Sequence, residues 1–271
     1  MRVRLAPGVD PARAIAEINQ LAGGVGAAVS PLSRNHPIDQ HNDYVRWATD
    51  LEVHLGSVLL REDAQAFFDN PRHRDICSML AGDQLTTLIS TELEVKRRDL
   101  LEMVNYLRGQ VARMQGGGLP IVVDSNALLE YQRPDSVNWK ALLGVEARLM
   151  IPLRVIEEIN DKKHSNSERL RSAARRLVPW IAKQFPNGDR GPVRLRDDAT
   201  IELILAERPR YRPSDADEEI LDVAHEVSQF AGRVKVMTGD LGMQLRATSE
   251  GLEVLVPPEE RPSGDNTQQS V

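Results

Sequence analysis

In the first 114 positions, apolar residues recur at spacings of three and four, which is the period of an amphipathic helix. Asp10 and Pro11 predict the start of a short helix ending near Leu21, and the glycine-rich stretch that follows predicts irregular structure until Pro37. Two long helices are expected over about 37–59 and 83–114, with short helical pieces around Phe67–Phe68 and Ile76–Met79. Residues 1–115 are therefore expected to form an all-helical domain of the bundle type.

Charged residues and the cysteine refine this picture. The second long helix is predicted to expose a charged face, made of Lys96, Arg97, Arg98 and Asp99. Cys77 has apolar neighbours and is expected to be a buried structural thiol. As the single cysteine, it excludes both an intramolecular disulfide framework and a cysteine-rich zinc site.

Three glycines at 116–118 mark the clearest boundary in the chain, and residues 116–119 are interpreted as a linker. Because these glycines follow a helix and precede a strand, they are not in the order of a phosphate-binding loop. Short apolar runs then alternate with helical patterns, which favours an α/β fold with a mostly parallel sheet. Strands are expected over 119–123, 147–151, 193–196, 200–207, 233–239 and 252–256, and helices over 125–131, 137–143, 155–163, 167–185, 217–231 and 241–250. Residues 120–257 form this second domain, and the polar, proline-rich residues 258–271 are predicted to be a disordered tail.

Acidic residues lie just beyond the predicted strands of this domain. Asp124 and Asp240 directly follow apolar runs, while Glu158 and Asp217 lie in helices. The carboxyl ends of parallel strands open on one crevice, where unpaired carboxylates repel each other strongly. A shared divalent cation relieves that repulsion, and oxygen ligands suit Mg²⁺ or Mn²⁺. Taken singly, each aspartate can instead cap a helix, and Glu158 can be a solvated helix residue.

At these positions residues 120–257 resemble the PIN domain, a metal-dependent ribonuclease fold of RNA-processing enzymes and toxin components. The matching residues are Asp124-Ser125-Asn126, then Pro152, Val155, Glu158, Ile159, Asn160 and Lys162, then Asp217 ahead of Ile220-Leu221, and finally Thr238-Gly239-Asp240. The neighbouring acids Glu157, Asp215 and Glu218 leave the second and third matches open by a position or two. The long segment between Glu158 and Asp217 suggests a larger subclass than a minimal toxin.

The resemblance implies a three-layer α/β/α fold and a divalent-metal-dependent endoribonuclease that hydrolyses RNA phosphodiester bonds. It implies that Asp124, Glu158, Asp217 and Asp240 are catalytic and hold Mg²⁺ or Mn²⁺. Glu158 is expected to be a ligand or a general base for the attacking water. Asn126 and Thr238 are expected to orient the carboxylates.

A basic stretch lies within this acidic protein of net charge −6. Residues 154–196 hold eleven Lys or Arg and five acids, so their net charge is 11 − 5 = +6. Positive charge beside a metal site suits a phosphate backbone, although a solvated helix face would look the same. The candidate RNA-binding residues are Lys162, Arg169, Arg175 and Arg176.

Aromatic residues and histidines add little to the candidate site. Trp180 and Tyr131 are the candidates for base stacking, and each can equally belong to the core. His164 is expected in a surface loop, and His225 on the inner face of its helix.

Two other functions fit the same pattern of acids. A non-catalytic RNA-binding or protein-interaction scaffold would keep the fold without turnover. A phosphatase of the haloacid-dehalogenase type also gathers aspartates at strand ends, but it needs a second acid two residues after the first, where Asn126 stands. The expected partner is single-stranded RNA, with a protein partner or self-association through the helical domain. The amino terminus has no apolar stretch and no window resembles a membrane span, so the expected location is cytoplasmic, with no membrane partner.

Overall fold

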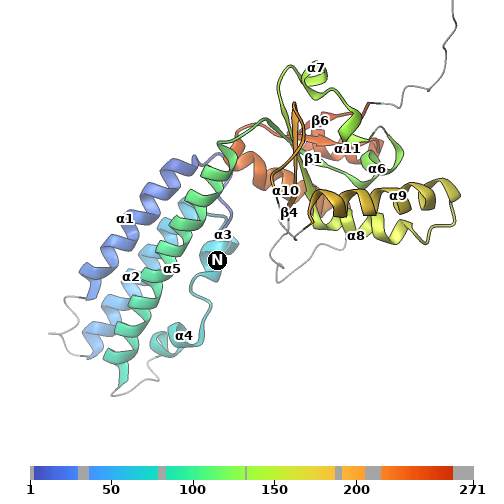
Figure 1. Cartoon of the computed structure of the whole chain (residues 1–271). Coiled ribbons are helices and arrows are strands. Elements are labelled where there is room, and N and C mark those ends of the chain that lie inside the picture. The colour runs from blue at the N-terminus through green and yellow to red at the C-terminus, as the bar shows by residue number, and fades with distance from the viewer. Residues whose placement is uncertain are drawn as a thin grey trace, which may run out of the picture. The chain divides into compact units, whose positions relative to one another are not determined.

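A computed structural model describes residues 3–29, 37–78, 84–131, 133–186, 191–204 and 215–258. Met79, Arg190, the last residues of the strand expected over 200–207 and the expected tail from residue 259 lie outside these ranges. The chain divides into two compact units, residues 1–115 and 116–271 (Figure 1). Each unit is described by itself.

The first unit is helical. Its elements are α1 (Pro11–Val29), α2 (Pro37–Val58), α3 (Arg61–Ala66), α4 (Pro71–Cys77) and α5 (Leu85–Met114). A single β-bridge joins Leu5 to Leu59. The long helices α1, α2 and α5 pack on one another (Figure 1), and α3 and α4 pack against α2. This unit matches the expected helical fold class.

The first helix begins as expected but is longer than predicted. The Asp10 carboxylate accepts a hydrogen bond from the backbone N–H of Arg13 over 3.0 Å, so Asp10 caps α1. The predicted end near Leu21 is wrong, because α1 continues to Val29. Ala22 and Val25 are buried, and α1 packs along α5. Burial of this face outweighs the low helix propensity of the intervening glycines.

Lys96 is not on the exposed face of α5, in contrast to the prediction from the sequence. Its side chain is 4% exposed, and its ammonium lies 3.7 Å from Oε1 of the fully buried Glu92. It also donates a hydrogen bond to the carbonyl of Phe67 and lies 4.2 Å from the centre of the Phe67 ring. Burial lowers the pKa of Lys96. The charged face is therefore limited to residues such as Arg97 and Arg98, which are exposed.

Cys77 is exposed, which corrects the prediction of a buried thiol. Ile76 is the residue of α4 that enters the core. Successive helix positions point about 100° apart, so the residue after Ile76 faces away from the core. The thiol Sγ lies 3.5 Å from Nε2 of His73.

The second unit contains a six-stranded sheet with the strand order β3-β4-β2-β1-β5-β6. Its strands are β1 (Leu119–Val123), β2 (Ala147–Pro152), β3 (Val193–Arg196), β4 (Ala199–Ile204), β5 (Lys235–Met237) and β6 (Glu253–Leu255). Its helices are α6 (Ser125–Glu130), α7 (Trp139–Leu143), α8 (Leu153–Lys162), α9 (Glu168–Gln184), α10 (Ala216–Ala231) and α11 (Leu241–Ser249), with a 3₁₀ turn at Pro134–Ser136. All neighbouring strands are parallel except β3 and β4. The expected mostly parallel α/β fold is confirmed.

Gly118 has a structural role at the start of this sheet. Its φ of +91° is one that L residues rarely adopt, and a β-carbon there would lie 2.8 Å from the carbonyl oxygen of Glu146. The next residue, Leu119, donates a 2.7 Å hydrogen bond to the same carbonyl. Gly118 thus lets β1 start in close contact with the chain that leads into β2.

The strand β1 is an inner strand of the sheet. It pairs with β2 on one side and with β5 on the other, with Val123 in register with Met237. Ile121, Val122 and Val123 are fully buried, as expected for a strand covered on both faces. The residues that follow β1 and β5 therefore emerge side by side at one edge.

Candidate metal centre

Asp124 and Thr238 occupy the adjoining carboxyl ends of β1 and β5. The backbone N–H of Asp124 donates to the carbonyl of Met237 over 3.0 Å, which continues the pairing of the two strands. The Thr238 hydroxyl donates to Oδ2 of Asp124 over 2.7 Å and accepts from the backbone N–H of Asp240 over 3.1 Å. Thr238 therefore contacts one carboxylate and the backbone of a second acidic residue.

Asp124 is a buried carboxyl group whose hydrogen bonds do not fully offset the cost of burying its charge. Only 3% of the residue is exposed. Burial raises the pKa of Asp124, and the nearby negative charge of Asp217 raises it further. The hydrogen bond from the Thr238 hydroxyl acts in the opposite direction, and so do the nearby backbone N–H groups of Ser125 and Asn126. Asp124 is the N-cap residue of α6, but its side chain makes no capping hydrogen bond, so Asn126 acts on the carboxylate only through its nearby backbone N–H.

Glu158 reaches the same place from α8. The helix follows β2 directly, with Pro152 at its N-cap and Val155 and Ile159 buried. The Ser125 side chain hydrogen-bonds the Glu158 carboxyl group. Burial raises the pKa of Glu158, and the charges of Asp124 and Asp217 add to that rise, while Arg154 opposes it. Glu158 therefore lies within electrostatic reach of two of the other acids.

Asp217 lies in the first turn of α10, and Arg246 of α11 contacts it. The Arg246 guanidinium lies 2.9 Å from Oδ2 of Asp217 and 2.7 Å from Oδ2 of Asp215. Burial raises the pKa of Asp217, Arg246 lowers it, and Asp215 and Asp240 raise it. The helix cap is Asp215, whose carboxylate accepts the backbone N–H of Asp217 over 3.1 Å. Capping therefore explains Asp215 and leaves the Asp217 carboxyl group available for another role.

Asp240 is an exposed residue that caps α11. Its Oδ1 accepts the backbone N–H of Met243 over 2.9 Å, so the capping alternative considered for this residue is realised. Its second carboxylate oxygen is not used in that bond. Its charge contributes to the raised pKa of Asp217, so it lies close to that acid.

The residues present suit a divalent cation in their chemistry. Asp124, Glu158 and Asp217 come from three different elements, each has a raised pKa, and each lies within the field of another. Clustered carboxyl groups with raised pKa values mark candidate functional sites. Within the described residues, no three Asp, Glu, His or Cys side chains are already positioned around one ion. Asp217 is paired with Arg246 and would have to change partners to become a ligand. Asp240 uses only Oδ1 in capping α11, so it could become a ligand through its other oxygen.

Three participants in this geometry were not singled out from the sequence. Ser125 contacts Glu158, Arg246 pairs with Asp217, and Arg154 lowers the pKa of Glu158. Ser125 was visible as the residue after Asp124 in the motif. Arg246 gave no local signal, because its role depends on how α11 lies beside the start of α10.

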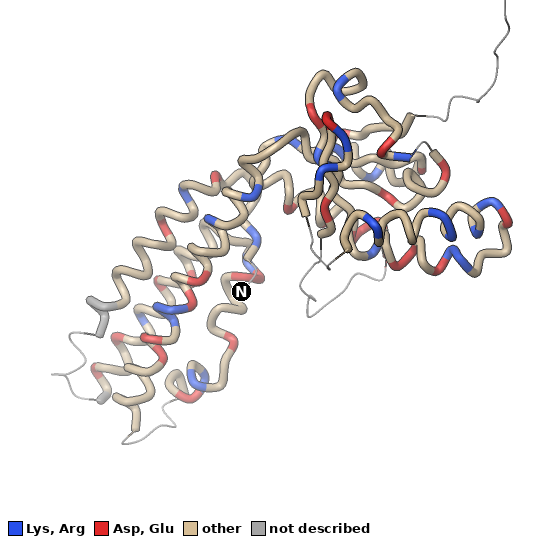
Figure 2. The backbone as a smooth tube through the Cα atoms, in the orientation of Figure 1, with Lys and Arg blue, Asp and Glu red and all other residues tan. Residues whose placement is uncertain are grey.

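Basic residues recur along α8 and α9, which lie side by side (Figures 1 and 2). Lys162, Arg175 and Arg176 are exposed. Arg169 is exposed as well, but it forms a 2.6 Å ion pair with Glu130 of α6. The four candidate RNA-binding residues are thus accessible, and one of them is partly neutralised.

The two candidate aromatic residues are both partly accessible. Trp180 donates a hydrogen bond to Asp135 over 3.1 Å, and the Arg133 guanidinium lies 5.8 Å from its ring centre. Tyr131 is half-buried and lies against Gly239. Neither residue is a fully buried core aromatic.

The two histidines considered from the sequence are both accessible to solvent. His164 is exposed, as expected. His225 is half-exposed and lies 2.7 Å from Glu250, so its expected place on the inner face of α10 is wrong. Val223, Ala224 and Val227 occupy the buried positions around it.

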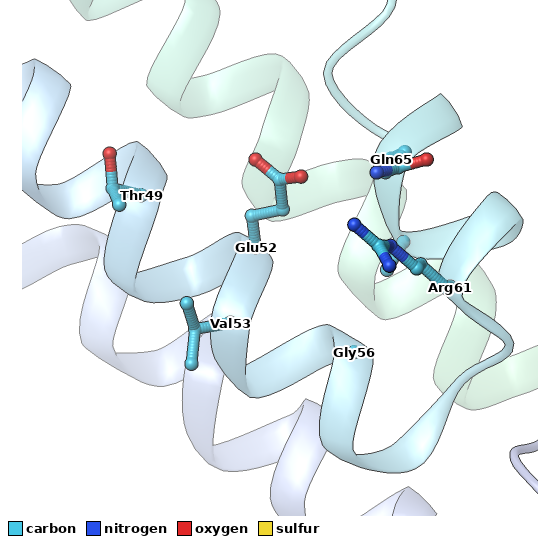
Figure 3. A pocket seen from close by; sticks show the side chains of 7 residues that line it. Thr49, Glu52, Val53, Gly56, Arg61 and Gln65 are labelled. Carbon is cyan, nitrogen blue, oxygen red and sulfur yellow. The ribbon is translucent and has the colours of Figure 1, made fainter.

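The first unit has a hollow of about 420 Å³ on its own surface, between α2 and α3 (Figure 3). Thr49, Glu52, Val53 and Gly56 line it from α2, and Arg61, Ala64 and Gln65 line it from α3. The apolar Val53 is 68% exposed. None of the four candidate acids belongs to this hollow.

The mostly parallel sheet and the carboxyl cluster at its edge define an α/β protein with a candidate cation site. The sequence pattern of the PIN domain matches residues 121–256, half of the chain, and the chain belongs to the PIN domain family. Members of this family are generally nucleases and typically use Mg²⁺ or Mn²⁺.

Two further comparisons complete this result. Among solved structures, the chain is similar to a domain of a functionally unknown protein from Methanocaldococcus jannaschii DSM 2661, at 15% identity and a TM-score of 0.32. That similarity covers 56% of this chain and all but 1% of the other. A comparison with curated proteins gives no match. None of the helices in the described ranges combines the length and apolar character that a membrane span requires.

Proposed function

We propose that this protein is a divalent-metal-dependent endoribonuclease that hydrolyses RNA phosphodiester bonds at the edge of the sheet. The observation that carries the proposal is the electrostatic coupling of Asp124, Glu158 and Asp217, which all have raised pKa values. Membership of a family of nucleases supports the same chemistry. Asp124, Glu158, Asp217 and Asp240 are the proposed ligands of Mg²⁺ or Mn²⁺.

The side chains have different tasks in this proposal. Asp124 is the central ligand, because the Thr238 hydroxyl holds its buried carboxylate in place. Asp217 and Asp240 complete the ligand set from the starts of α10 and α11. When bound, the ion lowers the pKa of a coordinated water and neutralises charge on the phosphate in the transition state.

Glu158 is the proposed proton acceptor. Its raised pKa brings it closer to the operating pH, which favours a general base. The Ser125 side chain lies beside the carboxyl group and lowers its pKa, which opposes the effect of burial. Glu158 would take the proton of the attacking water while Asp124 stays a ligand.

Single-stranded RNA is the proposed substrate. The exposed side chains of Lys162, Arg175 and Arg176, with Arg169 beside them, offer positive charge for its phosphates. The helical unit is proposed to bind a protein partner or a second copy of the chain. The exposed Val53 beside the hollow of α2 and α3 supports that role.

A cleavage assay tests the proposed activity. The full chain is incubated with end-labelled single-stranded RNA, and with DNA of the same sequence, in Mn²⁺, Mg²⁺ or EDTA. RNA cleavage is expected with either metal and not with EDTA. It is expected to be lost in Asp124→Asn and Asp240→Asn.

Asp197→Asn is the matched control. Asp197 is exposed in the turn between β3 and β4, next to the residue whose carbonyl pairs with the first residue of β2. It therefore lies at the opposite end of the strands and should leave cleavage unchanged. Cleavage that persists in EDTA, or in both site variants, would contradict the proposal. RNA binding without cleavage would favour the scaffold, and phosphate release from small monoesters alone would favour the phosphatase.

A further inference from the structure

Tyr131 lies against the backbone of the loop that carries Asp240. A β-carbon added to Gly239 would lie 2.4 Å from Cε2 and 2.5 Å from the hydroxyl oxygen of Tyr131. Real β-carbons essentially never come that close to another heavy atom. The ring therefore occupies the space that a side chain at position 239 would fill.

The backbone at Gly239 does not itself require glycine. Its φ lies outside the left-handed range, so an L residue could adopt this conformation. A side chain at position 239 would instead occupy the space in which the Tyr131 ring lies. Because Gly239 has no side chain, the aromatic ring can pack against the residue that precedes the acidic Asp240.

The chain on both sides of Tyr131 is held in place. Its neighbour Glu130 pairs with Arg169 of α9 over 2.6 Å. Two residues further on, the Arg133 guanidinium binds Asp135 and lies 5.8 Å from the Trp180 ring of α9. The sequence neighbours of Tyr131 therefore contact the basic helix α9, while its ring contacts the Thr238–Asp240 loop.

The half-buried ring has the right chemistry for one part of a nucleic acid. Phosphates are recognised by cations, which α9 supplies. A flat, uncharged ring on a half-buried residue instead offers a surface on which a base can stack. An RNA strand with one phosphate at the carboxyl cluster and others along α9 would bring a base to Tyr131.

We propose that Tyr131, seated on Gly239, is a stacking platform for a nucleobase next to the cleaved phosphate. This inference rests on the proposed function and adds a residue that contacts the base of the substrate. Because purines have larger π-surfaces than pyrimidines, adenine should gain more from the platform than uracil.

Equilibrium binding of the full chain to three 12-nucleotide probes tests this proposal. The probes are oligoadenylate, oligouridylate and an abasic ribose-phosphate strand of the same charge. Anisotropy is measured in Ca²⁺ instead of Mg²⁺, with a gel control showing that the RNA stays intact.

Tyr131→Ala is expected to weaken oligoadenylate binding by about 5- to 100-fold. The loss should be smaller on oligouridylate and absent on the abasic strand, while Tyr131→Phe should bind all three probes like the unmodified protein. Gly239→Ala keeps the tyrosine but fills the space in which its ring lies, so the ring must move. This variant should therefore reproduce the base-dependent loss even if Tyr131→Ala fails to fold. Mn²⁺ affinity should be unchanged in Tyr131→Ala.

Three results would overturn the proposal. Equal binding of oligoadenylate by the unmodified protein and both alanine variants would exclude stacking while leaving the proposed function intact. An equal loss on oligoadenylate and on the abasic strand would show that the ring acts only through packing. If the unmodified protein bound none of the three probes, the proposed function itself would fail, and the platform with it.

Discussion

The hydroxyl of Thr238 donates a 2.7 Å hydrogen bond to Oδ2 of Asp124, and both residues are buried. These residues are 114 positions apart in the sequence, and the pairing of β1 with β5 brings them together. The same hydroxyl accepts the backbone N–H of Asp240. One side chain therefore sets the orientation of the central carboxylate and the position of its neighbour.

Replacing Thr238 with valine should weaken both the metal site and the fold. Valine keeps the shape but removes the hydroxyl, so the buried Asp124 carboxylate loses a donor. We expect a loss of about 1–3 kcal/mol in the free energy of unfolding. We expect Mn²⁺ affinity to fall by about 10- to 100-fold. Denaturant titration measures the loss in stability, and calorimetry measures the loss in Mn²⁺ affinity.

Thr238→Ser is the control for this prediction. Serine retains the hydroxyl, so this variant should keep both the stability and the Mn²⁺ affinity. Unchanged Mn²⁺ affinity in the valine variant would be inconsistent with an orienting role for Thr238.

The carboxyl cluster should destabilise the metal-free protein at neutral pH. Burial raises the pKa of Asp124 in the folded state above its value in the unfolded chain. The folded state then binds the proton more tightly, so this group contributes stability below its unfolded pKa of about 3.9. That contribution is lost as the pH rises through the raised folded pKa. The pKa values of Glu158 and Asp217 are raised too, so their contributions have the same sign.

Asp124→Asn removes this charge and isolates its effect. In EDTA at pH 8 the variant should have the higher melting temperature, by about 2–4 °C for each kcal/mol gained. At pH 4 the difference between the two melting temperatures should be smaller, because a larger fraction of Asp124 is protonated than at pH 8. Adding Mn²⁺ at pH 8 should raise the melting temperature of the unmodified protein much more than that of the variant. A variant that melts lower than the unmodified protein in EDTA at pH 8 would contradict this account.

Arg246 should compete with the metal ion for Asp217. Its guanidinium lies 2.9 Å from the Asp217 carboxylate and lowers the pKa of that group. In Arg246→Gln we expect Mn²⁺ to bind about 3- to 10-fold more tightly at pH 8, because one nearby positive charge is gone. The pKa of Asp217 should rise, so binding should fail at a higher pH than in the unmodified protein. Calorimetry over a pH series measures both effects.

Arg233→Gln is the control for that experiment. Arg233 is also exposed and paired with a carboxylate, that of Glu253, but it precedes β5 and so lies at the other end of the strands. Its replacement should leave Mn²⁺ binding unchanged. Weaker Mn²⁺ binding in Arg246→Gln at pH 8 would show that Arg246 supports the site and does not compete for it.

The sequence was informative where local pattern and motif act together. Alternating strands and helices predicted the sheet, and the residues after β1 and β5 placed Asp124 and Asp240 at one edge. Burial of α1 was harder to predict, because Ala22 and Val25 become core residues only through packing on α5. Tertiary burial outweighed the local preference of glycine for irregular structure.

Charged residues were the main source of error. The prediction that Lys96 is exposed is wrong, because Glu92 and Lys96 recur at the same spacing as Leu85, Ile89 and Leu100 and are buried with them. The i,i+4 spacing of opposite charges on the apolar stripe was the available signal. For Arg246 no such signal exists, since its partners belong to α10 and the contact depends on the tertiary structure.

The basic face of α9 should account for part of the salt dependence of RNA binding. Arg175 and Arg176 are exposed. In Arg175→Ala/Arg176→Ala the slope of log affinity against log salt should become shallower by about 0.7 for each RNA phosphate that the variant no longer neutralises. The matched control is Arg97→Ala/Arg98→Ala, an exposed pair on α5. An equal change in slope for both pairs would mean that α9 offers no specific path for the strand.

The most direct test of the central claim is the anomalous scattering of a crystal grown with Mn²⁺. The account predicts one strong peak in contact with Asp124, at the usual metal–oxygen distance of about 2.0–2.3 Å. Asp217 should then have exchanged Arg246 for the ion, with Glu158 and Asp240 in contact with it directly or through water. A crystal that holds Mn²⁺ elsewhere, or shows no peak beside Asp124 at saturating Mn²⁺, would contradict the account.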